Sequence, residues 1–434
     1  MLHELGKKLC TLAEKYMPEP FTLATIVTFF TYILATTFTP SSTIDVIEYW
    51  YKDFWSFLPF SMQMCIILVS GYALSTTNIV KQMICRIACW PNNTVQATFL
   101  ISFTSIFFAL INWGLALIIG AFLARQVAIE GRRKNISLHY PLLGAAGYMG
   151  LAAWHGGLSG SAPLLIATQG HFLEKSVGVI PINETLFTPL NIVSSIILLL
   201  GVPLVLAALA PREEKDIVEY SGEIEEQTEE QTESNYSIWG MLVGIVGCIY
   251  ITYHLWIQQK SFDLNSLNFI FIFVGIFLHR NLDNYFNAIR SGVSACAGII
   301  LLFPFYAGIK GIMVHSGLVE LITNGVVSVA SATTLPIYIF ISAGVINFFV
   351  PSGGGQWIVQ GDIIVKSSQQ LGASINKTTL AFCYGDQWTN LLQPFWALAL
   401  LEITGLRAKD IMGYCLAIML IGIPVFIMLL YMFH

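Results

Sequence analysis

The sequence predicts an all-α integral membrane protein, built as an inverted repeat of transmembrane helices with two re-entrant hairpins and broken helices. Three observations predict this fold class: the composition, the number of long apolar runs, and paired polar interruptions within such runs. Of the 434 residues, 55% are apolar and 11% are charged, whereas about a quarter of residues are charged in a typical soluble domain. The composition argues against a soluble enzyme or a nucleic-acid-binding protein and predicts the lipid bilayer as a partner.

Five apolar runs are long enough to cross the hydrocarbon core as helices, which takes about 20 residues each. They are Phe21–Thr37, Phe57–Ala73, Phe187–Ala210, Trp239–Trp256 and Ile411–Phe433. Ahead of them, residues 1–19 carry leucines at helical spacing with lysines between them. We expect this segment to be an amphipathic helix in the membrane interface.

Polar, glycine-rich interruptions occur at matching places in the two halves. The first half contains residues 109–114 (ALINWG) and, about 40 residues further on, residues 153–163 (AWHGGLSGSAP). The second half contains residues 344–355 (GVINFFVPSGGG) and then residues 384–390 (YGDQWTN). Paired interruptions of this kind indicate the binding site of a secondary transporter.

The first interruption in each half is predicted to be the tip of a re-entrant hairpin, near residues 94–128 and near residues 335–367. With a cytoplasmic N-terminus, this topology places 15 of the 21 Lys and Arg residues on the cytoplasmic side, as the positive-inside rule expects. The remaining six, on the outer side, are Lys52, Lys175, Lys260, Lys310, Lys366 and Lys377.

The chain is therefore divided into five parts. After the amphipathic segment 1–19 come the first repeat 20–210, an acidic cytoplasmic linker 211–236, a connecting span and loop 237–266, and the second repeat 267–434. Ten acidic residues lie in the linker, against Arg212 and Lys215. So many like charges repel one another, and we expect the linker to be disordered or loosely helical and to bury nothing.

Unpaired backbone groups cost several kcal/mol each in hydrocarbon, so the interruptions must line a cavity or be satisfied by protein. New half-helices are expected after Asn112, near Ser161, after Gly355 and after Asn390. Helix N-termini offer free N–H donors and partial positive charge, which is chemistry for an anion. The predicted substrate-binding residues are Asn112, Trp113, Gly114, Ser159, Gly160, Ser161, Asn347, Ser352, Gly353, Gly354, Gly355, Gln356, Trp388, Thr389 and Asn390.

No Lys or Arg occurs in residues 87–123, 135–174, 311–365 or 378–406, which contain the breaks. One helix dipole contributes about 0.3 to 2 kcal/mol, whereas a carboxylate at the bilayer centre costs at least about 2.5 kcal/mol. Several helix ends can offset one negative charge, which favours a monocarboxylate over ligands that usually need an Arg clamp. Four tryptophans near the breaks are candidates for a wall against a small apolar tail: Trp113, Trp154, Trp357 and Trp388.

Asp386 and His155 are the two ionisable residues in the second interruptions of the two halves. An ionisable side chain within the membrane is a functional candidate, and either residue could carry a proton with the substrate. The eight cysteines show no Cys-x-x-Cys spacing, and we expect no metal site, disulfide or cofactor.

Three runs, residues 347–357 (NFFVPSGGGQW), 384–390 and 153–163, resemble the bacterial short-chain fatty acid transporter family, and the resemblance covers essentially the whole chain outside the linker. It implies an elevator-type anion carrier in the bacterial inner membrane that takes up acetoacetate- or butyrate-like substrates, often as a homodimer. Related carriers often bind sodium at Ser-Asn-Thr triplets in the hairpin tips. This chain has Ile-Asn-Trp at 111–113 and Ile-Asn-Phe at 346–348, which lack both hydroxyls and leave sodium coupling open beside proton coupling.

Three alternatives remain at this point. The first is a carrier of other small organic anions, such as lactate or C4-dicarboxylates. The second is a membrane acyltransferase that uses His155 with Asp386, although no nucleophile or metal constellation occurs at a usable spacing. The third is a channel, but matched hairpins entering from opposite sides suit alternating access better.

The topology can be tested by labelling single cysteines with a membrane-impermeant reagent. We expect cysteines at Arg132 and Glu226 to react only from the cytoplasmic side, and one at Lys377 to react from outside, because the hairpin returns the chain to its side of entry. Labelling of position 132 from outside would overturn the inverted-repeat topology.

Overall fold

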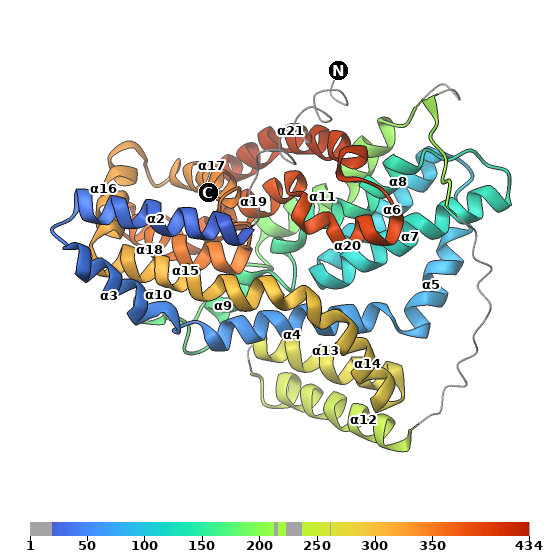
Figure 1. Ribbon diagram of the computed structural model, residues 1–434, viewed down its shortest axis with the longest axis horizontal. Coiled ribbons are helices and arrows are strands. Elements are labelled where there is room, and N and C mark those ends of the chain that lie inside the picture. The colour runs from blue at the N-terminus through green and yellow to red at the C-terminus, as the bar shows by residue number, and fades with distance from the viewer. Residues whose placement is uncertain (1–19, 212–215, 223–236, 261, 434) are drawn as a thin grey trace.

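The computed structural model describes residues 20–211, 216–222, 237–260 and 262–433, and these residues form helices, turns and loops without any strand (Figure 1). The predicted amphipathic segment 1–19 and most of the predicted linker lie outside the described residues. The molecule is elongated, and α12 (Ile238–Thr252), α13 (Leu264–His279) and α14 (Leu282–Gly292) form a layer beside α4 (Leu58–Ser75) (Figure 1).

The helices occur in the same order in both halves. The first half has α2 (Pro20–Phe38), α3 (Thr43–Phe54), α4, α5 (Asn78–Ala88), α6 (Thr94–Ala109), α7 (Trp113–Arg133), α8 (Tyr140–Tyr148), α9 (Ser161–Ala167), the short α10 (Glu174–Val177) and α11 (Pro189–Ala208). The second half has α13, α14, α15 (Ala297–His315), α16 (Leu318–Val329), α17 (Leu335–Asn347), α18 (Gly353–Leu371), α19 (Ile375–Thr389), α20 (Pro394–Thr404) and α21 (Ala408–Met432).

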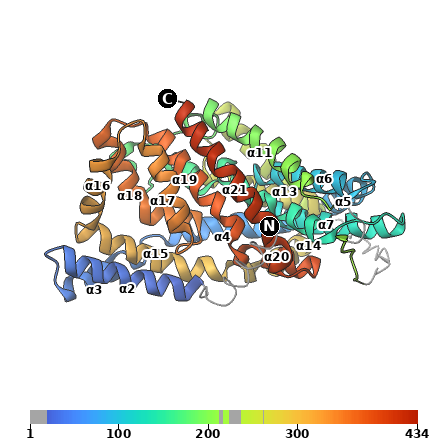
Figure 2. The same cartoon turned by 90° about the horizontal axis from the view of Figure 1, so that it is seen from above.

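The packing repeats as well as the order. Helices α4 and α5 pack on α7, just as α15 and α16 pack on α18. Between the halves, α3 packs on α15 and α14 packs on α4, while α9 contacts α18 and α20 contacts α7. Helices α11 and α21, which end the two halves, lie side by side (Figure 2). These reciprocal contacts are those of an inverted repeat, with hairpins α6–α7 and α17–α18 as its equivalent elements.

Side-chain caps place the hairpin tips. The Asn112 side chain accepts a hydrogen bond from Leu115 N, and the Ser352 side chain accepts one from Gly355 N, so each caps the second arm of its hairpin. The second half-helix therefore starts at Gly353, three residues before the predicted start after Gly355, because the Ser352 hydroxyl supplies the cap. Helix α7 continues to Arg133, beyond the predicted end near residue 128, because its last two turns carry charged residues that continue the helix past its apolar part.

Six of the described helices are long and apolar enough to cross a membrane, by length and composition. The span Ile238–Ile257, formed by α12 and the π-helical turn after it, buries only 22% of its apolar window within the protein. The large apolar side chains that it exposes, among them Trp239, Val246 and Ile249, are suited to lipid. The chain is thus a multi-pass membrane protein.

A part-buried ion cluster joins α3 of the first half to α15 and α18 of the second half. Lys310 Nζ on α15 lies 3.8 Å from Asp53 Oδ2 on α3 and 3.9 Å from Asp362 Oδ2 on α18, over the rings of Phe57 and Phe172. Helix α4, the counterpart of α15, contains no charged residue. The two halves therefore match in shape but differ in charge at this contact.

Residues 216–222 of the predicted linker pack on the protein. Tyr140 N donates to Val218 O at 2.8 Å, Val218 N donates to His139 Nδ1 at 3.1 Å, and Arg132 Nη1 donates to Gly222 O at 2.8 Å. None of these residues is fully buried, but the stretch makes specific contacts that the linker prediction did not include, among them the contact of the Tyr220 ring with that of Tyr140.

The close packing of hairpin α6–α7 on α8 can be tested at Gly120, where an added Cβ would lie 2.2 Å from Gly147 O. We expect Gly120→Ala to destabilise the protein by about 1–3 kcal/mol or more, because two backbones would have to separate. The matched control is Gly325→Ala in α16, where a Cβ meets nothing within 4 Å and better helix propensity should stabilise slightly. Thermal unfolding in detergent measures both, and equal midpoints for the two variants would contradict the packing argument.

Candidate functional site

The two hairpin tips and the two broken helices meet in one buried region. Trp154 Nε1 donates to Asn390 Oδ1 at 2.9 Å, which joins the break of the first half to that of the second. The Tyr148 hydroxyl adds bonds to the carbonyl oxygens of Asn390 at 2.9 Å and Gln393 at 3.0 Å. Backbone groups exposed by one break are therefore satisfied by the other half, as burial in hydrocarbon requires.

The first tip is held by polar bonds to its own half. Besides capping α7, Asn112 donates through Nδ2 to Ile67 O on α4 at 3.4 Å. Trp113 N donates to Ser159 Oγ at 3.0 Å. A Cβ at Gly160 would lie 2.3 Å from His155 O. Asn112, Ser159 and Gly160 thus fix the tip and the broken segment against each other.

The second tip is tied to α19 and to the turn after it. Asn347 Nδ2 donates to Asp386 O at 2.6 Å and to Thr389 Oγ1 at 2.9 Å. Gln393 Nε2 donates to Asn347 O at 2.7 Å. The break after Asn390 is a 3-10 turn, and α20 starts only at Pro394, because proline is favoured in the first turn of a helix.

A small cavity of about 30 Å³ lies where the tips meet. At about 10–15 Å³ for each water molecule, it holds about two waters in this closed arrangement. Six of its twelve lining residues were predicted from the sequence as substrate-binding residues: Trp113, Ser161, Ser352, Gly353, Gly354 and Asn390. The other six are Met64, Leu151, Trp154, Ile299, Phe303 and Trp396.

The polar groups around this cavity include donors that need an acceptor. Among the described residues, Trp113 Nε1 and Ser161 Oγ are buried without a hydrogen-bond partner, and their side chains line the cavity. Helix α18 starts at Gly353, so its first N–H groups have no partner within the helix. No Lys, Arg, Asp or Glu lines the cavity. The site therefore suits a ligand that accepts hydrogen bonds, and it offers no cation to pair with a second negative charge.

Other predicted residues lie around the cavity without lining it. Trp388 Nε1 donates to Met419 O on α21 at 2.6 Å, and its ring packs on Phe426. Gln356 Nε2 donates to Ala343 O at 2.7 Å and holds the two arms of the second hairpin together. The remaining three residues make contacts at the tips. Gly114 lies against Leu68, Gly355 lies against Tyr306, and Thr389 accepts a hydrogen bond from Asn347.

Asp386 and His155 form a fully buried pair beside the cavity. His155 Nδ1 lies 2.7 Å from Asp386 Oδ2, and His155 Nε2 accepts a hydrogen bond from Ala162 N at 3.2 Å. Because Nε2 is an acceptor, the ring proton is on Nδ1, and the imidazole is neutral and donates to the carboxyl group. The other carboxyl oxygen, Asp386 Oδ1, has no hydrogen-bond partner.

The pair also lies next to the second tip. A Cβ at Gly353 would approach Asp386 Oδ2 to 3.0 Å and the Trp154 ring to 2.6 Å. Gln387 Oε1 accepts hydrogen bonds from the backbone N–H groups of His155 and Gly156 at 3.0 and 3.2 Å. The Asp386 carboxyl group is therefore adjacent to the N-terminus of α18.

Sequence reasoning missed two kinds of residue. The apolar lining residues Met64, Ile299 and Phe303 come from α4 and α15, and no pattern separates them from other core residues. Gln387 is adjacent to Asp386 in a predicted motif, and its position in that motif was the available signal. In the described part of the chain, no group of three or more His, Cys, Asp or Glu residues is placed to hold a metal ion.

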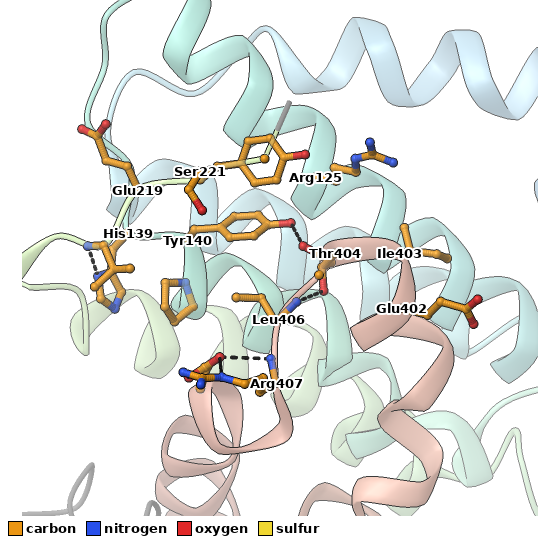
Figure 3. Close-up of a pocket in the computed structure, with 16 residues that line it drawn as sticks. Arg125, His139, Tyr140, Glu219, Ser221, Glu402, Ile403, Thr404, Leu406 and Arg407 are labelled. Atoms are coloured by element: carbon orange, nitrogen blue, oxygen red, sulfur yellow. Dashed lines mark hydrogen bonds and ion pairs between the residues drawn. The ribbon is translucent and has the colours of Figure 1, made fainter. Parts of the chain in front are cut away.

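A larger cavity, of about 670 Å³, lies beside linker residues 216–222 (Figure 3). Tyr140 reaches across it and donates from its hydroxyl to Thr404 O at 2.8 Å, and Arg407 pairs with Asp410 at 3.2 Å. Its lining contains both cations and carboxylates and none of the predicted substrate-binding residues. It therefore differs from the donor-lined cavity between the tips.

Two solved transporter structures resemble the fold over nearly the whole chain. The YdaH transporter of Alcanivorax borkumensis, described as having an unusual topology, superposes with a TM-score of 0.62 at 14% identity and covers 96% of this chain and 98% of its own. MtrF of Neisseria gonorrhoeae, described within a class of antimetabolite efflux pumps, gives a TM-score of 0.59 at 16% identity, with 96% and 95% covered. At these identities the similarity concerns the fold.

Sequence comparison identifies the family. The family model described as "Short chain fatty acid transporter" matches residues 1–433. A relative from Escherichia coli (strain K12) is 36% identical over 446 residues, with all of both chains covered. A second, from Haemophilus influenzae (strain ATCC 51907 / DSM 11121 / KW20 / Rd), is 36% identical over 454 residues, with 99% of this chain and all of the relative covered. Both carry the name "Putative short-chain fatty acid transporter". The chain belongs to the short-chain fatty acid transporter family.

Proposed function

We propose that the protein is a secondary active transporter that takes up short-chain monocarboxylates, of the acetoacetate or butyrate type, across the bacterial inner membrane. The observation that carries the proposal is the pair of buried, unpartnered donors, Trp113 Nε1 and Ser161 Oγ, at a cavity without charged residues. The indole N–H can only donate, so it is matched by an acceptor such as a carboxylate oxygen.

The balance of energies favours a single negative charge. Hydrogen bonds to charged groups contribute about 1.5–3 kcal/mol each, and the N-terminus of α18 adds about 0.3 to 2 kcal/mol. Together these exceed the cost of at least about 2.5 kcal/mol for one buried carboxylate. A second carboxylate would be buried without a partner, which argues against C4-dicarboxylates and leaves lactate and similar monocarboxylates as the nearest alternatives.

The cavity is too small in this conformation to admit a four-carbon acid, so the substrate must enter by relative movement of the surrounding elements. We assign the hairpins and broken helices, with α11 and α21, to a moving unit, and α2–α5 and α12–α16 to a scaffold. The basis is that each hairpin contacts the scaffold mainly through its second arm, on α4 and α5 or on α15 and α16. Sliding of the moving unit as a rigid body would carry the site across the membrane in the elevator manner.

Proton coupling is assigned to Asp386, with His155 as its positioning partner. The neutral imidazole donates to Oδ2 and accepts from Ala162 N, so a proton added to Nε2 would break the bond to Ala162. The partnerless Oδ1 can take a proton without breaking a bond. A protonated Asp386 beside a bound carboxylate would let the loaded site cross the membrane with one negative charge fewer, and sodium is the competing coupling ion.

Uptake of labelled butyrate into proteoliposomes tests the substrate assignment. We expect acetate, butyrate and acetoacetate to compete for uptake, and succinate to compete far less. Trp113→Phe removes the donor but keeps the ring, and should weaken apparent affinity by about 10- to 100-fold, from the loss of one hydrogen bond to a charged group.

The matched control is Trp357→Phe. Trp357 Nε1 is also buried without a partner but does not line the cavity. Affinity should be nearly unchanged in this variant. Stronger competition by succinate, or equal losses in the two Trp variants, would refute the assignment of the site.

Asp386→Asn tests the coupling role. The amide oxygen can still accept from His155, so the variant should fold, bind substrate and exchange it between two loaded sides. It should lose uphill uptake driven by an imposed pH gradient, because the amide carries no exchangeable charge. Asp362→Asn, which changes a half-buried carboxyl group outside the site, should keep pH-driven accumulation. Undiminished pH-driven accumulation by Asp386→Asn would assign the coupling to another group or to sodium.

A further inference from the structure

The residues that line the small cavity form two groups, which differ in polarity and in the unit of the protein that contributes them. Its hydrogen-bonding groups come from the moving unit: Ser161 of α9, Ser352 and the first residues of α18, and Asn390. Three of its apolar residues come from the scaffold, namely Met64 on α4 and Ile299 and Phe303 on α15. The hydrogen-bonding groups therefore belong to the moving unit, and these three apolar residues belong to the scaffold. In the proposed function these two units move relative to each other.

We infer that Met64, Ile299 and Phe303 form a scaffold wall that sets the chain length of the transported acid. This inference rests on the proposed function. With the carboxylate on the donors of the moving unit, the hydrocarbon tail is left to face this apolar wall. Apolar contact with the wall raises the affinity for a tail that fits by about fourfold for each buried CH₂.

Phe303 is the rigid member of the wall. It is only 2% exposed, and its ring packs against those of Phe60 and Tyr306, with centroids 5.7 and 6.3 Å away. A Cβ placed on Gly354 would lie 3.3 Å from the Phe303 ring, so this ring faces the hairpin tip that holds the carboxylate. Because its neighbours leave it little room to turn, Phe303 limits how far a tail can extend.

Met64 differs in that its unbranched side chain adapts to irregular shapes. Its presence explains how one wall can accept acids of two to four carbons while rejecting longer ones. A longer acid could occupy the donors while the scaffold wall is apart from them, but its tail would extend further against Phe303 than that of a four-carbon acid and would keep the wall from approaching the donors. Such an acid is expected to act as an inhibitor that is bound and not carried across.

The experiment measures uptake of labelled acetate, butyrate and hexanoate into proteoliposomes. For the unmodified protein, hexanoate should inhibit butyrate uptake and be poorly transported itself. Phe303→Ala should raise the ratio of hexanoate to acetate uptake by about tenfold or more, the lower end of what one methylene contributes to discrimination in an apolar pocket. The matched control is Phe271→Ala on scaffold helix α13, a buried phenylalanine that does not line the cavity, and its ratio should be unchanged.

The opposite change is made with Ile299→Phe, which fills the space that the tail needs. This variant should lose butyrate uptake and keep acetate uptake, so it tests the wall even where Phe303→Ala fails to fold. Uptake that persists with unaltered chain-length ratios in Phe303→Ala, or equal losses of acetate and butyrate in Ile299→Phe, would overturn the inference. Failure of the unmodified protein to transport any monocarboxylate would instead refute the proposed function.

Discussion

Backbone polar groups buried away from water must find partners, and this constraint shapes the centre of the molecule. Four interruptions bring free N–H and C=O groups into an apolar region, where each unmet group costs several kcal/mol. The structure meets most of this demand with side chains of the same few motifs: Asn112 and Ser352 as caps, Asn347 and Asn390 as bridges, and Gln387 beneath the His155 backbone. The polar motifs mainly satisfy the backbone groups at the breaks, and some of the donors left without a partner belong to residues that line the candidate site.

The same constraint explains why so much of the fold could be predicted. A glycine-rich polar stretch inside an apolar run costs free energy unless its polar groups find partners. The breaks and the hairpins around Asn112 and Asn347 therefore stand out in the sequence. The exact helix starts were predicted less well, because the serine that caps α18 and the proline that starts α20 set them a few residues away from the expected positions. The twofold recurrence of the breaks predicted the repeat before any contact between the halves was known.

The details of the site were less accessible to the same reasoning. Trp388 belongs to a predicted motif, but its indole is directed to Met419 on α21, because helical phase and long-range packing decide where a side chain points. Phe303 and Met64 look like any other residues of an apolar helix. Residues 216–222 lie in an acidic stretch whose charge predicted no packing, yet hydrogen bonds of Val218 with the Tyr140 backbone and the His139 side chain hold them. Contacts between segments distant in sequence decided each of these cases.

The ion cluster around Lys310 has a consequence for the energetics of the proposed alternating access. In a carrier made of two inverted halves, inward-facing and outward-facing states are produced when the halves exchange their local arrangements, and identical halves would make those states equal in free energy. Lys310 on α15 lies between Asp53 on α3 and Asp362 on α18 at one of the two equivalent contacts between the halves, while α4 has no charge at the matching place. If the protein works as proposed, the cluster would break this degeneracy and favour one resting state of the empty protein. Since part-buried charges are screened by salt only partly, that preference would persist at physiological ionic strength and set which side of the membrane the vacant site faces first.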